Sequence, residues 1–201
     1  MAFGGTRYDV SVNGLSENEV PRIETPRLVL RGWTDADVEA WADMNADPRV
    51  MEFFVEPTPR DRSREQAARM RSGLQRNGYG WFVLERKDRA GFAGVIALED
   101  IAYEVPFAPR REIGWRLPYA MWHHGYATEA ARAAMAFAFT TLGWGELIAM
   151  TARLNVRSMR VMERLGMTRD PGEDFPHPRV PAGHRLQPHV LYRISAPPRG
   201  E

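Results

Sequence analysis

The chain has 201 residues, of which 44% are hydrophobic, so it can bury one sizeable core and has the length of a single α/β domain. Its 27 Lys and Arg residues balance 26 Asp and Glu residues, which argues against nucleic acid or a membrane surface as a partner. The absence of cysteine excludes disulfides, thiol nucleophiles and Cys-ligated zinc. Because we find neither a signal-peptide pattern nor an apolar run of roughly 20 residues, we expect a cytoplasmic protein.

The pattern of the chain predicts one domain with short extensions. Residues 1–21 have no sustained hydrophobic period and end at Pro21, so we expect a flexible or loosely docked arm there. A single domain is expected over 22–196, followed by a tail over 197–201.

Hydrophobic periodicity and turn residues predict an alternation of strands and helices along this domain. Thr34, followed three positions later by Asp37, has the spacing of a helix cap. Three consecutive strands in the middle of the chain predict an antiparallel meander. In chain order the predicted elements are a strand over 27–31, a helix from Thr34 that ends before Pro48, a helix over 62–75, strands over 81–86, 91–98 and 111–117, a helix over 128–142, a strand over 147–151, a helix over 155–165, a loop over 170–188 and a strand over 189–194.

The stretch from Trp122 to Ala130 has the pattern of a phosphate-binding loop. A strand enters a short loop that contains Gly125 and Ala127, and a helix follows at once. Unpaired backbone N–H groups at a helix N-terminus attract anions, and Thr128 adds a hydroxyl. A lone Gly-x-Ala is weak evidence, and an ordinary helix entry is the simpler interpretation of the loop alone.

Five short motifs in a fixed order resemble the GNAT acetyltransferase superfamily, and specifically its RimJ/RimL-like branch of ribosomal-protein N-terminal acetyltransferases. The resemblance covers roughly Ile23 to Ile194. It implies an α/β (α+β) fold in which a mixed, mostly antiparallel sheet, flanked by helices, splits in a V around acetyl-CoA, with the pyrophosphate on the loop. The motifs lie at 24–31, 47–51, 112–115, 122–130, and 155–158 together with 164–167.

The resemblance also indicates which residues hold acetyl-CoA. The loop usually opens with Gln or Arg, whereas this chain has Trp122, as is common in the branch and is expected to anchor the core. The next position is often Gly in the branch but is His123 here. His123 and His124 are expected to be solvated, although a protonated His124 could touch a phosphate. The cofactor-binding residues we expect are Leu117, His124, Gly125, Tyr126, Ala127, Thr128, Asn155 and Ser158.

Two catalytic residues are expected. Glu112, on the strand before the loop, is the candidate base for the acceptor amine, with a solvent-facing carboxylate or a partner for Arg110 or Arg111 as an equally weighted alternative. The superfamily often supplies a tyrosine as the acid for the leaving thiolate, but that position is Met162 here, so the resemblance suggests Ser158 instead. Oxyanion stabilisation is expected from a backbone N–H at Leu117 or Arg116.

For the remaining conspicuous polar residues, a structural or solvent-exposed role is the simpler interpretation. His177, His184 and His189 lack helical spacing and Cys partners, so no metal is expected. Glu99 and Asp100 could attract an amine, but solvation at a strand end is the simpler interpretation. Asn155 fits an N-cap, because Ser158 follows three residues on.

The expected function is transfer of an acetyl group from acetyl-CoA to a primary amine, with a protein N-terminus as the leading acceptor. A small-molecule amine or antibiotic acetyltransferase of the same fold remains an alternative. A non-catalytic acyl-CoA-binding module is a second alternative, because fold alone does not establish activity. Exposed sheet edges in this fold often pair, so a homodimer is possible.

Overall fold

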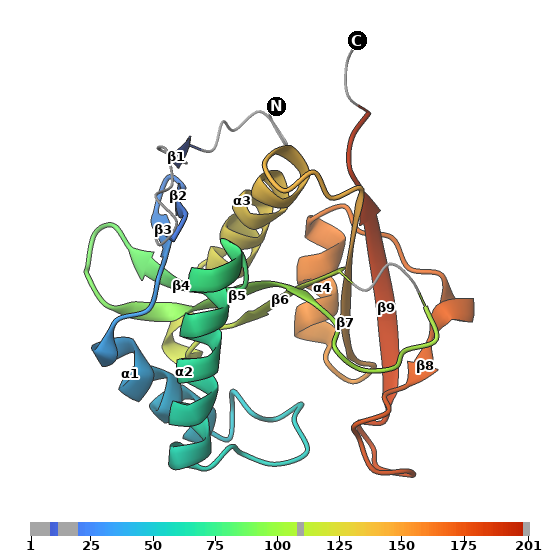
Figure 1. Cartoon of the computed structure of the whole chain (residues 1–201). Helices are drawn as coiled ribbons and strands as arrows, with labels where there is room; N and C mark the ends of the chain where they lie inside the picture. Colours follow the sequence, from blue (N-terminus) through green and yellow to red (C-terminus); the bar gives the residue numbers. More distant parts are fainter. Residues whose placement is uncertain (1–8, 12–19, 108–110, 199–201) are drawn as a thin grey trace.

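A nine-stranded sheet runs through the molecule in the order β1-β2-β3-β4-β5-β6-β7-β9-β8 (Figure 1). This computed structural model describes residues 9–11, 20–107 and 111–198. The strands are β1 (Asp9–Ser11), β2 (Arg22–Glu24), β3 (Leu28–Arg31), β4 (Trp81–Arg86), β5 (Phe92–Asp100), β6 (Arg111–Arg116), β7 (Glu146–Ala152), β8 (Phe175–Pro176) and β9 (Pro188–Ser195). The α-helices are α1 (Asp35–Ala46), α2 (Arg60–Asn77), α3 (Tyr126–Thr140) and α4 (Val156–Arg164), and two 3₁₀ turns are η1 (Tyr119–Met121) and η2 (Pro171–Glu173).

The sheet consists of two antiparallel parts joined at one parallel step. Strands β1 to β6 pair antiparallel in chain order, and β7 pairs antiparallel with β9. Between these parts, β6 and β7 run parallel and pair at one position, Glu112 with Ile148. Beyond this pair the two strands separate, which confirms the mixed, mostly antiparallel sheet with a V-shaped split. The antiparallel meander predicted for the middle of the chain is β4–β5–β6.

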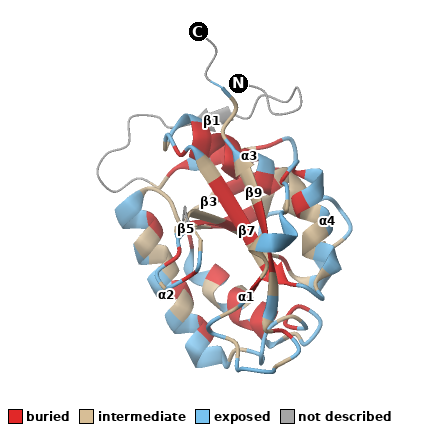
Figure 2. Cartoon of the chain, turned by 90° about the vertical axis from the view of Figure 1, so that its right-hand side faces the viewer, coloured by how far each residue is buried: buried red, intermediate tan, exposed pale blue. Residues whose placement is uncertain are grey.

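Helix α3 covers one face of the sheet. Its run of alanines lets the helix axis approach the strands closely, and Phe137 meets Phe82 of β4 edge to face, with ring centroids 6.1 Å apart. Figure 2 shows buried residues concentrated on the strands and on the inner side of the helices. The largest part of the core therefore lies between α3 and the sheet.

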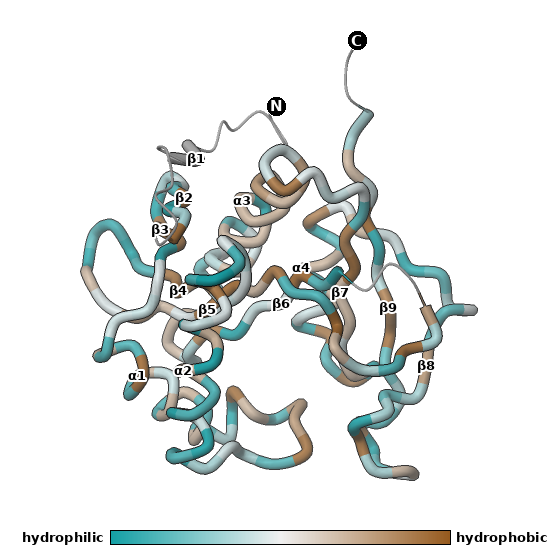
Figure 3. Tube along the Cα trace, viewed as in Figure 1, coloured by the Kyte–Doolittle hydropathy of each residue, from teal (hydrophilic) through white to brown (hydrophobic). Residues whose placement is uncertain are grey.

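Helices α1 and α2 cover the opposite face. Trp41 of α1 packs against Trp33 and Trp81, with centroid distances of 6.0 Å to each. Helix α2 contributes few buried residues, among them Leu74, and Figure 3 shows it as mostly hydrophilic. On β4, Phe82 and Trp81 thus point to opposite faces, as the alternation of a strand requires.

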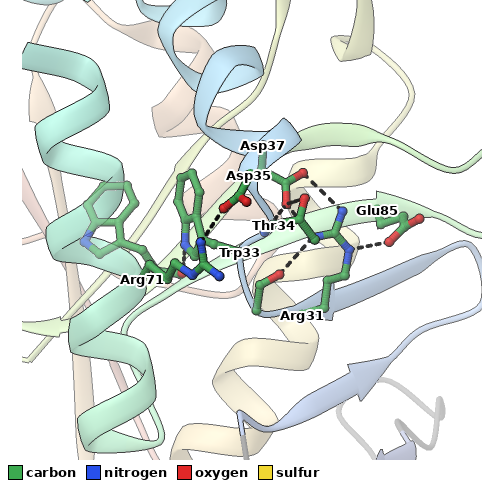
Figure 4. Close-up of polar contacts among 9 residues, drawn as sticks. Arg31, Trp33, Thr34, Asp35, Asp37, Arg71 and Glu85 are labelled. Atoms are coloured by element: carbon green, nitrogen blue, oxygen red, sulfur yellow. Dashed lines mark hydrogen bonds and ion pairs between the residues drawn. The ribbon is translucent and has the colours of Figure 1, made fainter. Parts of the chain in front are cut away.

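The predicted cap of the first helix is part of a buried charge cluster (Figure 4). The Asp37 carboxylate accepts hydrogen bonds from the Thr34 backbone N–H and hydroxyl, both at 2.7 Å. Arg31 donates to Asp37 from two nitrogens, at 2.7 and 3.1 Å, and also pairs with Glu85. Because only 2% of Asp37 is exposed, these bonds fix the start of α1 against β3 and β4.

The structure contains short elements that the sequence did not predict, among them the strand β2 before the predicted strand over 27–31. Within the arm expected over 1–21, residues 9–11 form β1, which pairs with β2 along the sheet edge. The rest of that arm up to residue 19 and the end of the tail, 199–201, lie outside the described residues. The loop predicted over 170–188 contains η2 and the short strand β8, because Phe175 and Pro176 pair with the start of β9. Among the described helices, none is long and apolar enough to cross a membrane.

Candidate active site

A cavity of about 1050 Å³ lies where β6 and β7 separate. Its walls come from β6, from the loop before α3 and the start of that helix, from β7, from α4, and from the segment between α1 and α2. All the predicted site residues line this cavity: Glu112, Leu117, His124, Gly125, Tyr126, Ala127, Thr128, Asn155 and Ser158. The split in the sheet thus brings together residues that are far apart in the sequence.

The start of α3 fits a phosphate group. Gly125 has a φ of 80°, a left-handed conformation that glycine adopts without steric cost, and it turns the chain directly into the helix. Gly125 is the N-cap of this helix and has no side chain that could cap it. The first backbone N–H groups of α3, at Tyr126, Ala127 and Thr128, are therefore available to an anion that enters the cavity.

An ion pair between Arg27, just before β3, and Glu129 of α3 fixes the position of this loop. The Arg27 Nε lies 2.6 Å from Glu129 Oε2, and Arg27 Nη1 donates to the His124 carbonyl at 2.9 Å. Glu129 also accepts hydrogen bonds from the Arg27 backbone N–H and the Thr25 hydroxyl. The Arg27 guanidinium lies 4.8 Å from the centre of the Tyr126 ring. Sequence analysis assigned no role to Arg27 or Glu129, although both lie within the motifs that carried the resemblance.

The two unusual residues of the loop have different surroundings. Trp122 is half-buried, packs against the core and donates from Nε1 to the Leu117 carbonyl at 2.9 Å, as expected for an anchor. His123 and His124 are exposed, as expected for solvated residues. His123 has a φ of 65°, the one positive value at a non-glycine position among the described residues. This left-handed conformation explains why glycine suits the position.

Glu112 lies at the vertex of the split. Burial, together with the negative charge of Glu99, raises the pKa of Glu112 to about 8. Glu99 lies directly across from it on β5 and accepts a hydrogen bond from Trp81 Nε1 at 2.8 Å. Arg111, one of the two alternative partners, pairs with Asp100 instead, at 3.8 Å. The other, Arg110, lies outside the described residues.

Asn155 and Ser158 form the wall on the side of α4. The Asn155 Oδ1 accepts from the Ser158 backbone N–H at 3.2 Å, which confirms Asn155 as the N-cap of α4. Its Nδ2 donates to Thr151 Oγ1 at 2.9 Å and to Ser158 Oγ at 3.1 Å. Since Ser158 Oγ accepts this bond, its own hydrogen remains free to donate. Met162 also lines the cavity and has no proton to donate.

Leu117, directly after β6, is held against β5. A Cβ on Gly94 would lie 2.7 Å from the Arg116 carbonyl oxygen and 2.8 Å from Leu117 Cγ. Only glycine permits this approach, and its φ of 132° favours glycine as well. The backbone of residues 116 and 117, expected to supply the oxyanion N–H, is thereby fixed in position.

Several basic residues of the cavity have no role in the sequence-based prediction. Arg132 of α3 and Arg160 and Arg164 of α4 line it next to the loop, and Arg132 Nη2 donates to the Arg164 carbonyl at 2.9 Å. Such side chains suit the phosphates of coenzyme A. The sequence did not predict a shared basic site, because these arginines lie on two helices that come together only in the folded chain.

The histidines considered as metal ligands lie elsewhere. His177 Nε2 is 2.9 Å from the Tyr103 hydroxyl, and the rings of His177 and His189 are 4.5 Å apart. His184 hydrogen-bonds within its own loop. No group of three potential metal ligands occurs among the residues that the structure describes.

Comparisons of the sequence and of the structure with known proteins identify the same family. Residues 27–168 match the model of the acetyltransferase (GNAT) domain. The chain is 27% identical over 155 residues to the uncharacterized N-acetyltransferase YoaA of Bacillus subtilis. The aligned segment covers 75% of this chain and 84% of YoaA. The chain belongs to the GNAT acetyltransferase family, and it is an acetyl-CoA-dependent N-acetyltransferase.

Solved structures show the same fold. A GNAT-family acetyltransferase from Bacillus anthracis superposes with a TM-score of 0.72 at 25% identity, over 87% of this chain and 98% of the other. The ribosomal-protein-S5-alanine acetyltransferase from Vibrio fischeri gives a TM-score of 0.67 at 16% identity, over 87% and 96% of the two chains. At that identity the second comparison concerns the fold alone.

Proposed function

We propose that this enzyme acetylates an α-amine, with the N-terminal α-amine of a protein as the leading acceptor, in the manner of the RimJ/RimL-like branch. The observation that carries the proposal is the position of Glu112 in the cavity wall at the vertex of the split, where burial and the neighbouring Glu99 raise its pKa to about 8. An α-amine has a pKa of about 7.7 to 8.0, whereas a lysine amine has one of about 10.4. Proton transfer from an α-amine to Glu112 is therefore almost balanced, while a lysine-like amine would hold its proton too tightly.

The other residues of the cavity have complementary tasks. The N–H groups at the start of α3, with Arg132 and Arg160 beside them, bind the phosphates of acetyl-CoA, which supplies the activated acetyl group. The acceptor nitrogen attacks the thioester carbonyl, and its proton passes to Glu112 directly or through a water molecule. The backbone N–H of Leu117 or Arg116 stabilises the oxyanion, and the Ser158 hydroxyl donates a proton to the departing thiolate.

A small-molecule amine remains the second candidate. The walls that face the acceptor include Phe53 and Phe54 from the segment between α1 and α2, and this segment is short and partly exposed. These residues contact a small amine as readily as the first residues of a peptide. Both candidates use the same cofactor site and the same base.

An acceptor panel tests the proposal. Calorimetry first measures coenzyme A binding, and free-thiol detection then follows turnover with peptides, amino-acid amides, polyamines and aminoglycosides. We expect micromolar binding and thiol release with α-amines, fastest with peptides. Turnover confined to polyamines or aminoglycosides would overturn the α-amine assignment. Binding without thiol release on the whole panel would indicate a non-catalytic module.

A further inference from the structure

Arg116 occupies the same face of β6 as Glu112. Residues 112, 114 and 116 alternate with those that face α3, and the register pairs Glu112 with Glu99 and Arg116 with Val95. Four strand residues span about 13 Å, so the carboxylate and the guanidinium lie at two ends of one row. Gly114 between them has no side chain, and a Cβ there would meet only Ala97 Cβ, at 3.9 Å. Both Glu112 and Arg116 line the cavity.

The surroundings hold the guanidinium of Arg116 in a fixed plane. It lies 4.9 Å from the centre of the Trp41 ring and 4.1 Å from that of the Phe54 ring. Its Nη1 donates to Asn45 Oδ1 at 2.6 Å, and the buried Asn45 amide is oriented by its bond to Ser63 Oγ. A guanidinium has five N–H donors. Among the described residues, Asn45 Oδ1 is the acceptor for one donor of Arg116.

No carboxylate of the described residues balances the charge of Arg116. Among the described residues, none forms an ion pair with Arg116, whereas the nearby Arg157 is paired with Glu52. Burial lowers the pKa of Arg116 to about 10, without a compensating charge, so the group is still protonated at neutral pH. A cation removed from water without a counter-charge costs several kcal/mol. An anion that enters the cavity would offset this cost.

We propose that Arg116 binds a carboxylate of the acceptor, so that the preferred acceptor is a peptide N-terminus with an acidic side chain in its first three residues. This inference rests on the proposed function and specifies its substrate class. An extended peptide rises about 3.3 Å per residue. With the amine at Glu112, the backbone of the first three residues together with an acidic side chain can therefore bring a carboxylate to the Arg116 guanidinium. The planar guanidinium can bind a carboxylate through two parallel hydrogen bonds.

Two other ligands fit Arg116 less well. The phosphates of coenzyme A are expected at the start of α3, while Arg116 packs on α1 and the segment after it, on the opposite face of the sheet. A polyamine would place further positive charge near Arg116 and would be repelled. Free acidic amino acids share the carboxylate chemistry, and they are included in the test.

Matched peptide acceptors test the proposal in two measurements. The peptides are amidated tripeptides with Asp or Asn at position one, two or three, and free aspartate is the small-molecule arm. Thiol release gives kcat/KM, and calorimetry gives the affinity of each peptide for the enzyme saturated with coenzyme A. The enzymes are wild type, Arg116→Gln, Arg116→Lys and the control Arg111→Gln, whose arginine is on the same strand but outside the cavity.

We expect wild type to prefer one Asp peptide over its Asn counterpart by about tenfold in kcat/KM and in affinity, because one charge-assisted pair is worth on the order of 1.4 kcal/mol. Arg116→Gln should abolish this preference with unchanged coenzyme A affinity and melting temperature, Arg116→Lys should keep part of it, and Arg111→Gln should keep all of it. Preference for free aspartate over every peptide would overturn the peptide assignment.

Other outcomes separate the two hypotheses. Equal use and equal binding of Asp and Asn peptides by wild type would overturn the role of Arg116 and leave the acetyltransferase intact. If Arg116→Gln lowers kcat/KM for the Asp and Asn peptides equally, and also lowers the melting temperature or weakens coenzyme A binding, Arg116 has a structural or cofactor-binding role instead. Arg116-dependent binding of the Asp peptide without thiol release would support Arg116 and refute the proposed function.

Discussion

Glu112 lies directly across from Glu99 on β5 and pairs on its other side with Ile148 of β7. This position places its carboxylate at the vertex of the split, half-buried and beside a second negative charge. Both conditions favour the protonated acid at neutral pH. In the proposed mechanism, the pH dependence of activity therefore reports on the ionisation of Glu112.

Replacement of Glu112 by Gln should remove one ionisation from the pH profile. In wild type, log kcat/KM should rise with a slope of two at low pH, because both the amine and Glu112 must lose a proton, and Glu112 should titrate near pH 8. Glu112→Gln should lower the rate about 100-fold and leave a slope of one. Glu99→Gln, which removes only the neighbouring charge, should shift the profile to lower pH and keep both ionisations. An unchanged slope in Glu112→Gln would exclude Glu112 as the base.

The same pKa shift should change stability with pH. The unfolded carboxyl ionises near 4.5, whereas the folded one keeps its proton up to about pH 8. The stability that Glu112 contributes is therefore complete below pH 4.5 and is lost as the pH rises to 8, by about 1.4 kcal/mol per pKa unit. Glu112→Gln should thus gain melting temperature relative to wild type between pH 5 and 8. Thermal unfolding across this range measures the difference, and a constant difference would contradict the shifted pKa.

Glu129→Gln should weaken coenzyme A binding. Its carboxylate holds Arg27 in place, and Arg27 in turn binds the His124 carbonyl within the loop. Loss of this charge should raise the dissociation constant of coenzyme A about tenfold, or about 1.4 kcal/mol. The control Arg22→Gln breaks the exposed pair with Glu24 on β2 and should have no effect. Calorimetry measures both, and equal affinities would show that the pair does not order the loop.

Ser158→Ala should have a small effect on turnover. The Ser158 hydroxyl is free to donate to the leaving thiolate, but a thiol with a pKa of about 8.5 leaves readily without full protonation. We expect kcat to fall less than about tenfold. The N-cap bond to the Ser158 backbone remains, so the melting temperature should not change. A loss of kcat near that of Glu112→Gln would instead make Ser158 an essential acid.

His123→Gly should stabilise the protein. A left-handed residue other than glycine costs roughly 1–2 kcal/mol, and the greater freedom of glycine in the unfolded chain offsets part of the gain. We expect a rise in melting temperature of about 2 °C. Coenzyme A affinity should change little, because in the proposed site the phosphates bind to backbone N–H groups of the loop and not to the His123 side chain. A lower melting temperature would mean that the His123 ring makes a stabilising contact that outweighs the strain.

Sequence analysis predicted helix starts correctly where the hydrogen bonds that form them join residues close together in the chain. The Thr34–Asp37 spacing predicted the start of α1, and the Asn155–Ser158 spacing predicted the cap of α4, because such bonds join residues three positions apart. The strands β1 and β2 were missed, since three residues without a hydrophobic period give no signal until a neighbouring strand lies beside them. The strand β8 was missed for the same reason.

The sequence by itself determined the strands and helices that have a hydrophobic period and the glycine at the start of α3, because each depends on its immediate neighbours in the chain. The candidate site residues followed from the resemblance of its motifs to the family. Only the tertiary structure decided the chemistry of those residues. The pKa of Glu112 depends on burial and on Glu99 of another strand. Arg116 has no carboxylate partner in the described chain, because α1 and the segment after it place two aromatic rings and an amide around its guanidinium. Such contacts join residues distant in sequence, so only folding establishes them.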